Sequence, residues 1–141
     1  KAYNVNYIAT KHIADEVKKN KIEWFFFSST SHVYSSKKNN ISEKTKTKPI
    51  SYYGTTKLLA EKYIIKILEK SDSKYCIGRI FSTTNKNQKE NYLVPDLKKK
   101  IKQSKKRLTL HNLNHHRDFI SMIDIHSMET IQTVLLGWDG A

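Results

Sequence analysis

Residues 22–28, Ile-Glu-Trp-Phe-Phe-Phe-Ser, form a short and nearly continuous apolar run. Such a run is typical of a β-strand that is buried on both faces, as in a parallel sheet. Hydroxyl side chains follow at residues 28–31, Ser-Ser-Thr-Ser. Because ligands of open α/β sheets bind at the carboxyl ends of the strands, these hydroxyls are candidates for hydrogen bonding a substrate oxygen.

The segments on either side of this strand alternate between helical and extended patterns. Apolar side chains recur at helical spacing in residues 4–20 and again in residues 51–70, which predicts two amphipathic helices. A second strand of the buried type is predicted at residues 74–81. The order helix, strand, helix, strand predicts an α/β fold with a doubly wound parallel sheet.

The pattern after residue 81 is less regular. It predicts a polar loop at residues 82–92 and a very basic helix at 95–105. Three further elements are predicted, namely a short strand at 108–110, an extended piece at 117–121 and a helix at 123–136.

The charge of the chain is strongly positive, with 26 Lys and Arg against 13 Asp and Glu and a formal net charge of +13. Such a charge points first to nucleic-acid binding. However, only Arg79, Arg107 and Arg117 are arginines, and arginine is the residue that reads bases and stacks on them. The lysines are scattered, so we prefer a solvated surface that attracts anionic substrates such as nucleotide diphosphates.

Three other classes of site are not expected. Cys76 is the single cysteine and lies in an apolar run, which indicates a buried, unreactive thiol and fits a cytoplasmic location. The apolar runs are too short to span a bilayer, so no membrane partner is expected. His111, His115 and His116 lack carboxylate or thiolate neighbours, so no metal site is expected.

Tyr53 and Lys57 lie four residues apart, in the first turns of the second predicted helix, and therefore share one face. A free phenol has a pKa of about 10 and is a poor base at neutral pH. A cation beside it favours the phenolate and lowers that pKa. The pair would work as a proton shuttle, although Tyr-x-x-x-Lys also occurs by chance in a Lys-rich chain.

Taken in order, these motifs resemble the NAD-dependent epimerase/dehydratase branch of the extended short-chain dehydrogenase/reductase family. Residues 28–34 are similar to its Ser-Ser/Thr-x-x-Val-Tyr segment, and residues 49–57 to its Pro-x-x-x-Tyr-Gly-x-x-Lys helix start. Other segments also match the pattern of this family, namely Asn6, Arg79-Ile80-Phe81, Tyr92-Leu93-Val94-Pro95, and Arg117-Asp118-Phe119-Ile120 followed by Asp124-Ile125.

The resemblance implies a partial Rossmann-like fold. Residues 1–81 would form the second half of a dinucleotide-binding domain with the catalytic residues, and residues 82–141 an incomplete substrate-binding region. Tyr53 would exchange a proton with a sugar oxygen. Lys57 would lower the pKa of Tyr53 and hold the nicotinamide ribose. Thr30 would hydrogen bond the same sugar oxygen.

The resemblance also implies the ligands and the assembly. The cofactor would be NAD or NADP, held by Ser28, Tyr53, Lys57 and Ile80. The substrate would be a nucleotide diphosphate sugar, held by Thr30, Ser31, Ser82, Leu93 and Arg117. Of these, Arg117 would grip the diphosphate. The helices at residues 4–20 and 51–70 would form the contact of a homodimer.

Two departures from the family pattern matter. Ser31 and His32 stand where the dehydratases have an acidic pair, so epimerisation or 4-keto reduction is expected rather than dehydration. The phosphate-binding loop G-x-x-G-x-x-G has no counterpart among the four glycines. We therefore expect an internal piece of a longer enzyme. An inactive fragment or a basic binding module that keeps the fold without binding cofactor stays open as the alternative.

Overall fold

The computed structural model describes residues 1–35, 41–104, 108, 110, 119–123 and 125. The chain divides into two compact units, residues 1–80 and residues 81–141. Each unit is described by itself.

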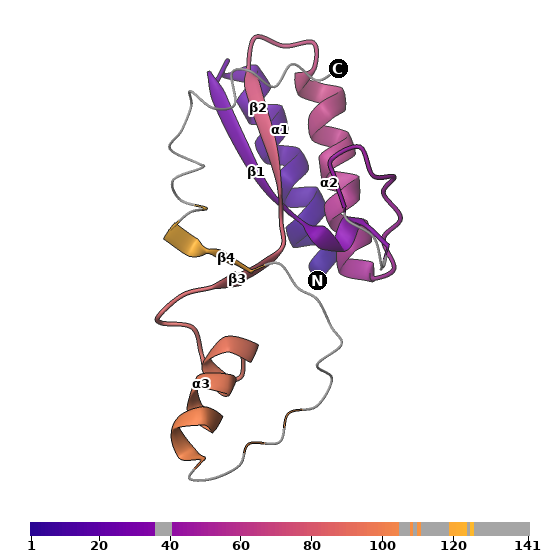
Figure 1. Cartoon of the computed structure of the whole chain (residues 1–141). Coiled ribbons are helices and arrows are strands. Elements are labelled where there is room, and N and C mark those ends of the chain that lie inside the picture. The colour runs from indigo at the N-terminus through magenta and orange to yellow at the C-terminus, as the bar shows by residue number, and fades with distance from the viewer. Residues whose placement is uncertain (36–40, 105–107, 109, 111–118, 124, 126–141) are drawn as a thin grey trace. The chain divides into compact units, whose positions relative to one another are not determined.

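The first unit alternates helices and strands, which confirms the predicted α/β class (Figure 1). Its helical and extended elements are the π-helix η1 (Asn4–Ile8), α1 (Ala9–Lys19), β1 (Trp24–Thr30), the 3-10 turn η2 (Ser31–Val33), α2 (Tyr52–Leu68) and β2 (Lys74–Ile80).

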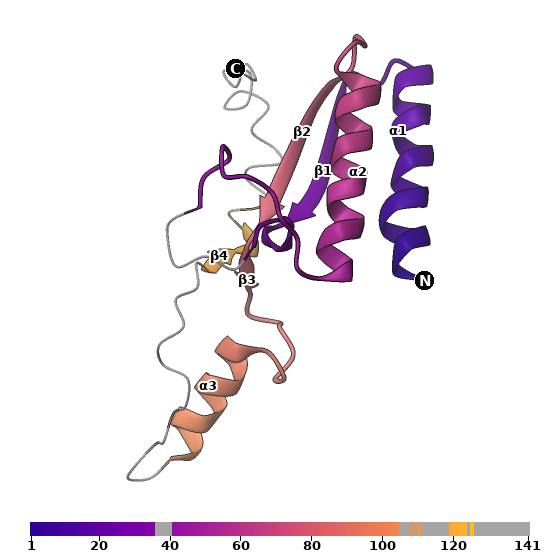
Figure 2. The same cartoon turned by 90° about the vertical axis from the view of Figure 1, so that its right-hand side faces the viewer.

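The two strands β1 and β2 are parallel neighbours, joined by α2. Trp24 pairs with Lys74 at one end of the ladder and Thr30 with Ile80 at the other. The carboxyl ends of both strands therefore lie at one edge, which is where open α/β sheets bind ligands. Figure 2 shows α1 and α2 side by side, on the same side of the two strands.

The core lies between these helices and the sheet. Its buried members are Ala14, Val17, Phe27, Ala60, Ile64 and Leu68. Successive strand residues point to opposite faces, so Phe26 lies on the face away from Phe27, with its ring against Gly78. Phe26 is only half-buried. Within the described residues the strand thus differs from the expected one, because α1 and α2 cover one of its two faces.

The first helix ends in a Schellman motif. The N–H of Ile22 donates to the carbonyl of Val17 at 3.0 Å, and the N–H of Lys21 donates to that of Lys18 at 3.2 Å. Lys21 takes a φ of 50°. This turn leaves Ile22 exposed before β1, whereas the apolar run predicted that Ile22 lies within the strand.

The buried side of the first helix is narrower than predicted. Thr10, Ala14 and Val17 are buried, but Val5 and Ile13 are 61% and 52% exposed. The helical segment formed by η1 and α1 therefore exposes apolar side chains as well as burying them.

The second unit contains β3 (Ser82–Thr84) in parallel pairing with β4 (Phe119–Ser121), and the helix α3 (Leu93–Gln103). The β-branched Thr83 and Thr84 favour a strand where a loop was predicted. Pro95 lies in the first turn of α3, where its missing N–H is tolerated, so the helix begins two residues earlier than predicted.

Other predictions for this unit are tested only in part. Leu108 and Leu110 lie in no helix or strand, and residue 109 of that predicted strand is outside the described residues. Met122, Ile123 and Ile125 are helical, while the rest of the predicted last helix is outside them. Among the described residues, no helix is both long and apolar enough to cross a lipid bilayer.

Candidate active site

The first turn of α2 packs directly on the 3-10 turn η2. Ser51 caps the helix, and its hydroxyl accepts a hydrogen bond from the N–H of Gly54 at 3.0 Å. A Cβ built on Gly54 would meet the carbonyl carbon of His32 at 2.9 Å and its oxygen at a still shorter distance. Only glycine permits this approach, which brings Tyr53 beside His32.

His32 links the two hydroxyl side chains that were predicted to be catalytic. Its ring makes an edge-on contact with Tyr53, with centroids 5.8 Å apart. Its backbone N–H donates to the Oγ1 of Thr30 at 3.3 Å. Thr30 is buried at the end of β1, and no group within the described residues accepts a hydrogen bond from its hydroxyl, which can donate as well as accept. Tyr53 is 43% exposed, so its phenol is accessible from solvent.

Lys57 is held one helical turn after Tyr53, at the carboxyl end of β1. Its Nζ donates to the backbone carbonyl of Ser28 at 2.9 Å and lies 4.8 Å from the centroid of the Phe27 ring. Partial burial lowers the pKa of Lys57 from its ordinary value. The ammonium therefore occupies a fixed place, and this hydrogen bond uses one of its three donors.

The buried Thr56 holds the first turn of α2 through two hydrogen bonds. The Oγ1 of Thr56 donates to the backbone carbonyl of Tyr53 at 2.8 Å and accepts from the Nδ2 of Asn6 at 3.1 Å. Asn6 lies in η1, a π-helical turn, and such turns are frequent at functional sites. The side chain of Asn6 thus ties the first helical segment to the turn that holds Tyr53.

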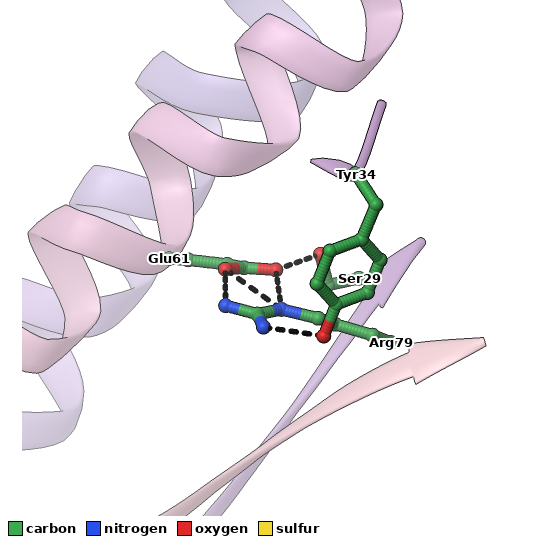
Figure 3. Close-up of polar contacts among 4 residues, drawn as sticks. All are labelled: Ser29, Tyr34, Glu61 and Arg79. Atoms are coloured by element: carbon green, nitrogen blue, oxygen red, sulfur yellow. Dashed lines mark hydrogen bonds and ion pairs between the residues drawn. The ribbon is translucent and has the colours of Figure 1, made fainter. Parts of the chain in front are cut away.

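An ion pair between the buried Glu61 and the half-buried Arg79 lies further along α2 (Figure 3). The carboxylate of Glu61 accepts from the guanidinium of Arg79 and from the hydroxyl of Ser29, and Arg79 also donates to the hydroxyl of Tyr34. The predicted site did not include this group. Two signals could have revealed it, namely a glutamate one turn after Lys57 on a largely apolar helix face and an arginine inside an apolar strand.

The structure brings together the predicted site residues of the first unit. Ser28 and Lys57 share a hydrogen bond, and Thr30 and Ile80 are register partners at the strand ends. Ser31 follows as the first residue of η2. The remaining predicted residues are Ser82 in β3 and the exposed Leu93 of α3, both in the second unit, and Arg117, which lies outside the described residues.

The chain is also similar to known proteins of one enzyme family. The model of the NAD dependent epimerase/dehydratase family matches residues 1–128. An uncharacterised UDP-glucose epimerase of Bacillus subtilis (strain 168), YtcB, is 29% identical over 123 residues, which are 87% of this chain and 38% of that protein.

Two solved structures show the same fold. A UDP-N-acetylglucosamine 4-epimerase from Methanobrevibacter ruminantium M1, in complex with UDP-N-acetylmuramic acid, has a TM-score of 0.79 at 25% identity. The match covers 91% of this chain and 43% of that one. A UDP-glucuronic acid 4-epimerase from Bacillus cereus, in complex with UDP-glucuronic acid and NAD, has a TM-score of 0.72 at 27% identity, over 91% and 41%.

The chain spans only about two fifths of the length of each of these relatives. Even so, the family match covers most of the chain, and the predicted site residues of the first unit meet at the parallel β1–α2–β2 unit. This chain belongs to the NAD-dependent epimerase/dehydratase family.

Proposed function

We propose that this chain contains the proton-transfer centre of an NAD(P)-dependent enzyme that acts on a nucleotide sugar, with epimerisation of a UDP-sugar as the reaction. The observation that supports it most directly is the placement of Lys57. Its ammonium is fixed at the carbonyl of Ser28, one turn from the exposed phenol of Tyr53. The three relatives described above are named as epimerases, which favours epimerisation over 4-keto reduction.

In this proposal Tyr53 takes the proton of the reacting sugar hydroxyl. Lys57 stabilises the phenolate that this requires, because a nearby cation favours the charged form. The hydroxyl of Thr30 donates a hydrogen bond to the same sugar oxygen. NAD, when bound, supplies hydride transfer. In epimerisation the proton returns to the same oxygen, so one acid–base group serves both directions.

The residues at this edge fit a dinucleotide. The side chain of Ser28 is exposed, and within the part of the chain that the structure describes the ammonium of Lys57 donates one of its three hydrogens, to the Ser28 carbonyl. The edge also lies at the carboxyl ends of parallel strands, where this class of sheet binds ligands. We propose Ser28, Tyr53, Lys57 and Ile80 as cofactor contacts. The proposed substrate contacts are Thr30, Ser31, Ser82, Leu93 and Arg117.

Two further predictions remain proposals. A homodimer through residues 4–20 and 51–70 is supported by the apolar side chains that these helices leave exposed, among them Val5, Ile13 and Ile65. A cytoplasmic location is supported by the free thiol of Cys76, whose pKa is raised by burial and which is therefore poorly reactive.

The test uses the longest open reading frame that contains this chain. The purified protein is incubated with NAD and with UDP-glucose, UDP-N-acetylglucosamine or UDP-glucuronic acid, and the 4-epimer is followed by NMR. Tyr53→Phe is expected to lower kcat by about 10²–10⁴-fold, because it removes the acid–base group. Tyr52→Phe is the matched control, since Tyr52 is the preceding residue and is 66% exposed.

The same assay separates the alternatives. Epimerisation forms no net NADH, whereas a 4-keto reductase running in reverse would form one NADH for each sugar hydroxyl that it oxidises. If none of the three sugars turns over, or if Tyr53→Phe is as active as the wild type, the proposed function is wrong. Salt-dependent nucleic-acid binding would then support the basic binding module.

A further inference from the structure

Glu61 is a carboxylate inside the first unit, with 1% of its surface exposed. The Nε of Arg79 donates to its two oxygens at 3.1 and 3.2 Å, and the Nη2 donates to one of them at 2.8 Å. The hydroxyl of Ser29 also donates to this carboxylate. The carboxylate of Glu61 therefore accepts hydrogen bonds from both strands, from Ser29 of β1 and from Arg79 of β2, as Figure 3 shows.

The other edge of Arg79 is also held. Its Nη1 donates to the hydroxyl of Tyr34 at 2.7 Å, and its guanidinium carbon lies 5.0 Å from the centroid of the Tyr34 ring. The hydrogen bonds to Glu61 raise the pKa of Arg79, so its guanidinium stays protonated. We call Ser29, Tyr34, Glu61 and Arg79 the Glu61 network.

The burial of the Glu61 network has a cost in free energy. Removing two charges from water is costly, and apolar residues of similar volume often stabilise a core as well or better. A buried network is geometrically specific, however, because each of its hydrogen bonds is met in only one arrangement of the parts. We therefore expect the network to align the helix, strands and turn that it joins.

The elements joined by the Glu61 network are the ones that present the proposed acid–base residues. Ser29 stands in β1 between Ser28, which holds Lys57, and Thr30. Glu61 stands in α2 one turn after Lys57. Tyr34 directly follows η2, the turn that contains His32. One residue of slip along α2 would move its side chains by about 1.5 Å.

We propose that the Glu61 network is a positioning device, which fixes the slide and rotation of α2 on the sheet so that Lys57 and Tyr53 meet the carboxyl end of β1. This role rests on the proposed function, since it serves the proton transfer. A displacement of about 1 Å at a reacting group can lower a rate by about 10²-fold.

The decisive variant is the double substitution Glu61→Met with Arg79→Met, which removes both charges and keeps the volume. We expect a folded protein with a cooperative thermal transition, but kcat reduced by about 10-fold to 10²-fold and KM changed by less than about threefold. A purely structural role would leave kcat unchanged once the protein is folded. The control is Glu16→Gln with Lys19→Met, which removes an exposed ion pair of α1.

A second readout needs neither substrate nor cofactor. The phenolate absorbance at 295 nm is titrated for each protein and for the same protein with Tyr53→Phe, and the difference isolates Tyr53. If the network positions Lys57 beside Tyr53, the midpoint of Tyr53 moves to higher pH in the double variant, because the cation is no longer held there.

Two single substitutions keep the proposal testable if the double variant does not fold. Ser29→Ala and Tyr34→Phe each remove one hydroxyl and keep the ion pair, and each is expected to lower kcat by about threefold to tenfold. The positioning role is overturned if the folded variants match the wild type in both kcat and the titration of Tyr53. If the wild type itself shows no turnover, the proposed function fails, and the titration alone still decides whether the network places Lys57.

Discussion

Gly54 lies against the main chain of His32, with the carbonyl of His32 in the place that a side chain on Gly54 would occupy. Two pieces of chain that carry the proposed acid–base residues meet at this contact. One is the turn after β1, which includes Thr30, and the other is the start of α2, which presents Tyr53. The contact therefore governs whether Tyr53 and His32 lie side by side.

Gly54→Ala is expected to destabilise the protein, although alanine in an ordinary helix is about 1 kcal/mol better than glycine. The added methyl group collides with rigid backbone, and such overpacking costs about 1–3 kcal/mol. The measurement is the free energy of unfolding in urea. Gly78→Ala is the control and should cost less, because the atom that it meets is the tip of the movable Phe26 ring, 2.6 Å away. Greater stability in Gly54→Ala would show that the first turn of α2 can move away.

Lys57→Met should lower the activity without lowering the stability. Without the cation, the phenolate of Tyr53 is less favoured, so kcat at pH 7 falls by about 10²-fold and the pH for half-maximal kcat rises. Burial lowers the pKa of Lys57, so the charged form opposes folding below that pKa. The free energy of unfolding at pH 7 is therefore not expected to fall.

The measurements for this prediction are a pH–rate profile and a urea titration of the same samples. Lys62→Met, on the exposed side of α2, is the matched control and should change neither. An unshifted pH profile in Lys57→Met would mean that Lys57 does not act on Tyr53.

Thr56→Val tests the support beneath Tyr53. It removes the bond to the Tyr53 carbonyl and the acceptor of Asn6 while keeping the shape of a fully buried side chain. We expect the free energy of unfolding to fall by about 1–3 kcal/mol, measured in urea. Thr55→Val, at the exposed neighbouring position, should cost less than about 1 kcal/mol. Equal effects at the two positions would argue against a special role of the Asn6 bond.

The hydroxyl of Tyr63 should lose its proton only at high pH. Its hydroxyl donates to the Oδ1 of Asp15 at 2.7 Å, and this bond raises the pKa of Tyr63 to about 12. Because the pKa in the folded state is raised above that of the unfolded chain, the stabilisation is complete below about pH 10 and is lost as the pH rises through about 12.

The test compares the wild type with Tyr63→Phe. Absorbance at 295 nm should show one fewer tyrosine that titrates near pH 12, and the stability difference between the two proteins should shrink between pH 10 and 12. Asp15→Asn should return the midpoint of Tyr63 toward 10. A midpoint of Tyr63 near 10 in the wild type would show that the bond to Asp15 does not form in solution.

The sequence was sufficient for the fold class and for placing Tyr53 and Lys57 together near the start of α2. Apolar runs and helical spacing located β1, β2, α2 and the helical segment formed by η1 and α1 to within about two residues, because these patterns reflect which sides of an element are buried. The spacing of Tyr53 and Lys57 placed both on one helix face. The proposed catalytic role of these two residues remains a prediction.

Tertiary structure alone decided which distant groups meet. Glu61 and Arg79 are separated by 18 residues, and their pairing depends on how α2 crosses β2. The close approach of Gly54 to His32 depends in the same way on the path of the chain after β1. Sequence periodicity reports which side of an element is buried, but not which residue of another element it touches. The alignment of the proposed site therefore depends on long-range contacts, whereas the elements that carry it are encoded locally.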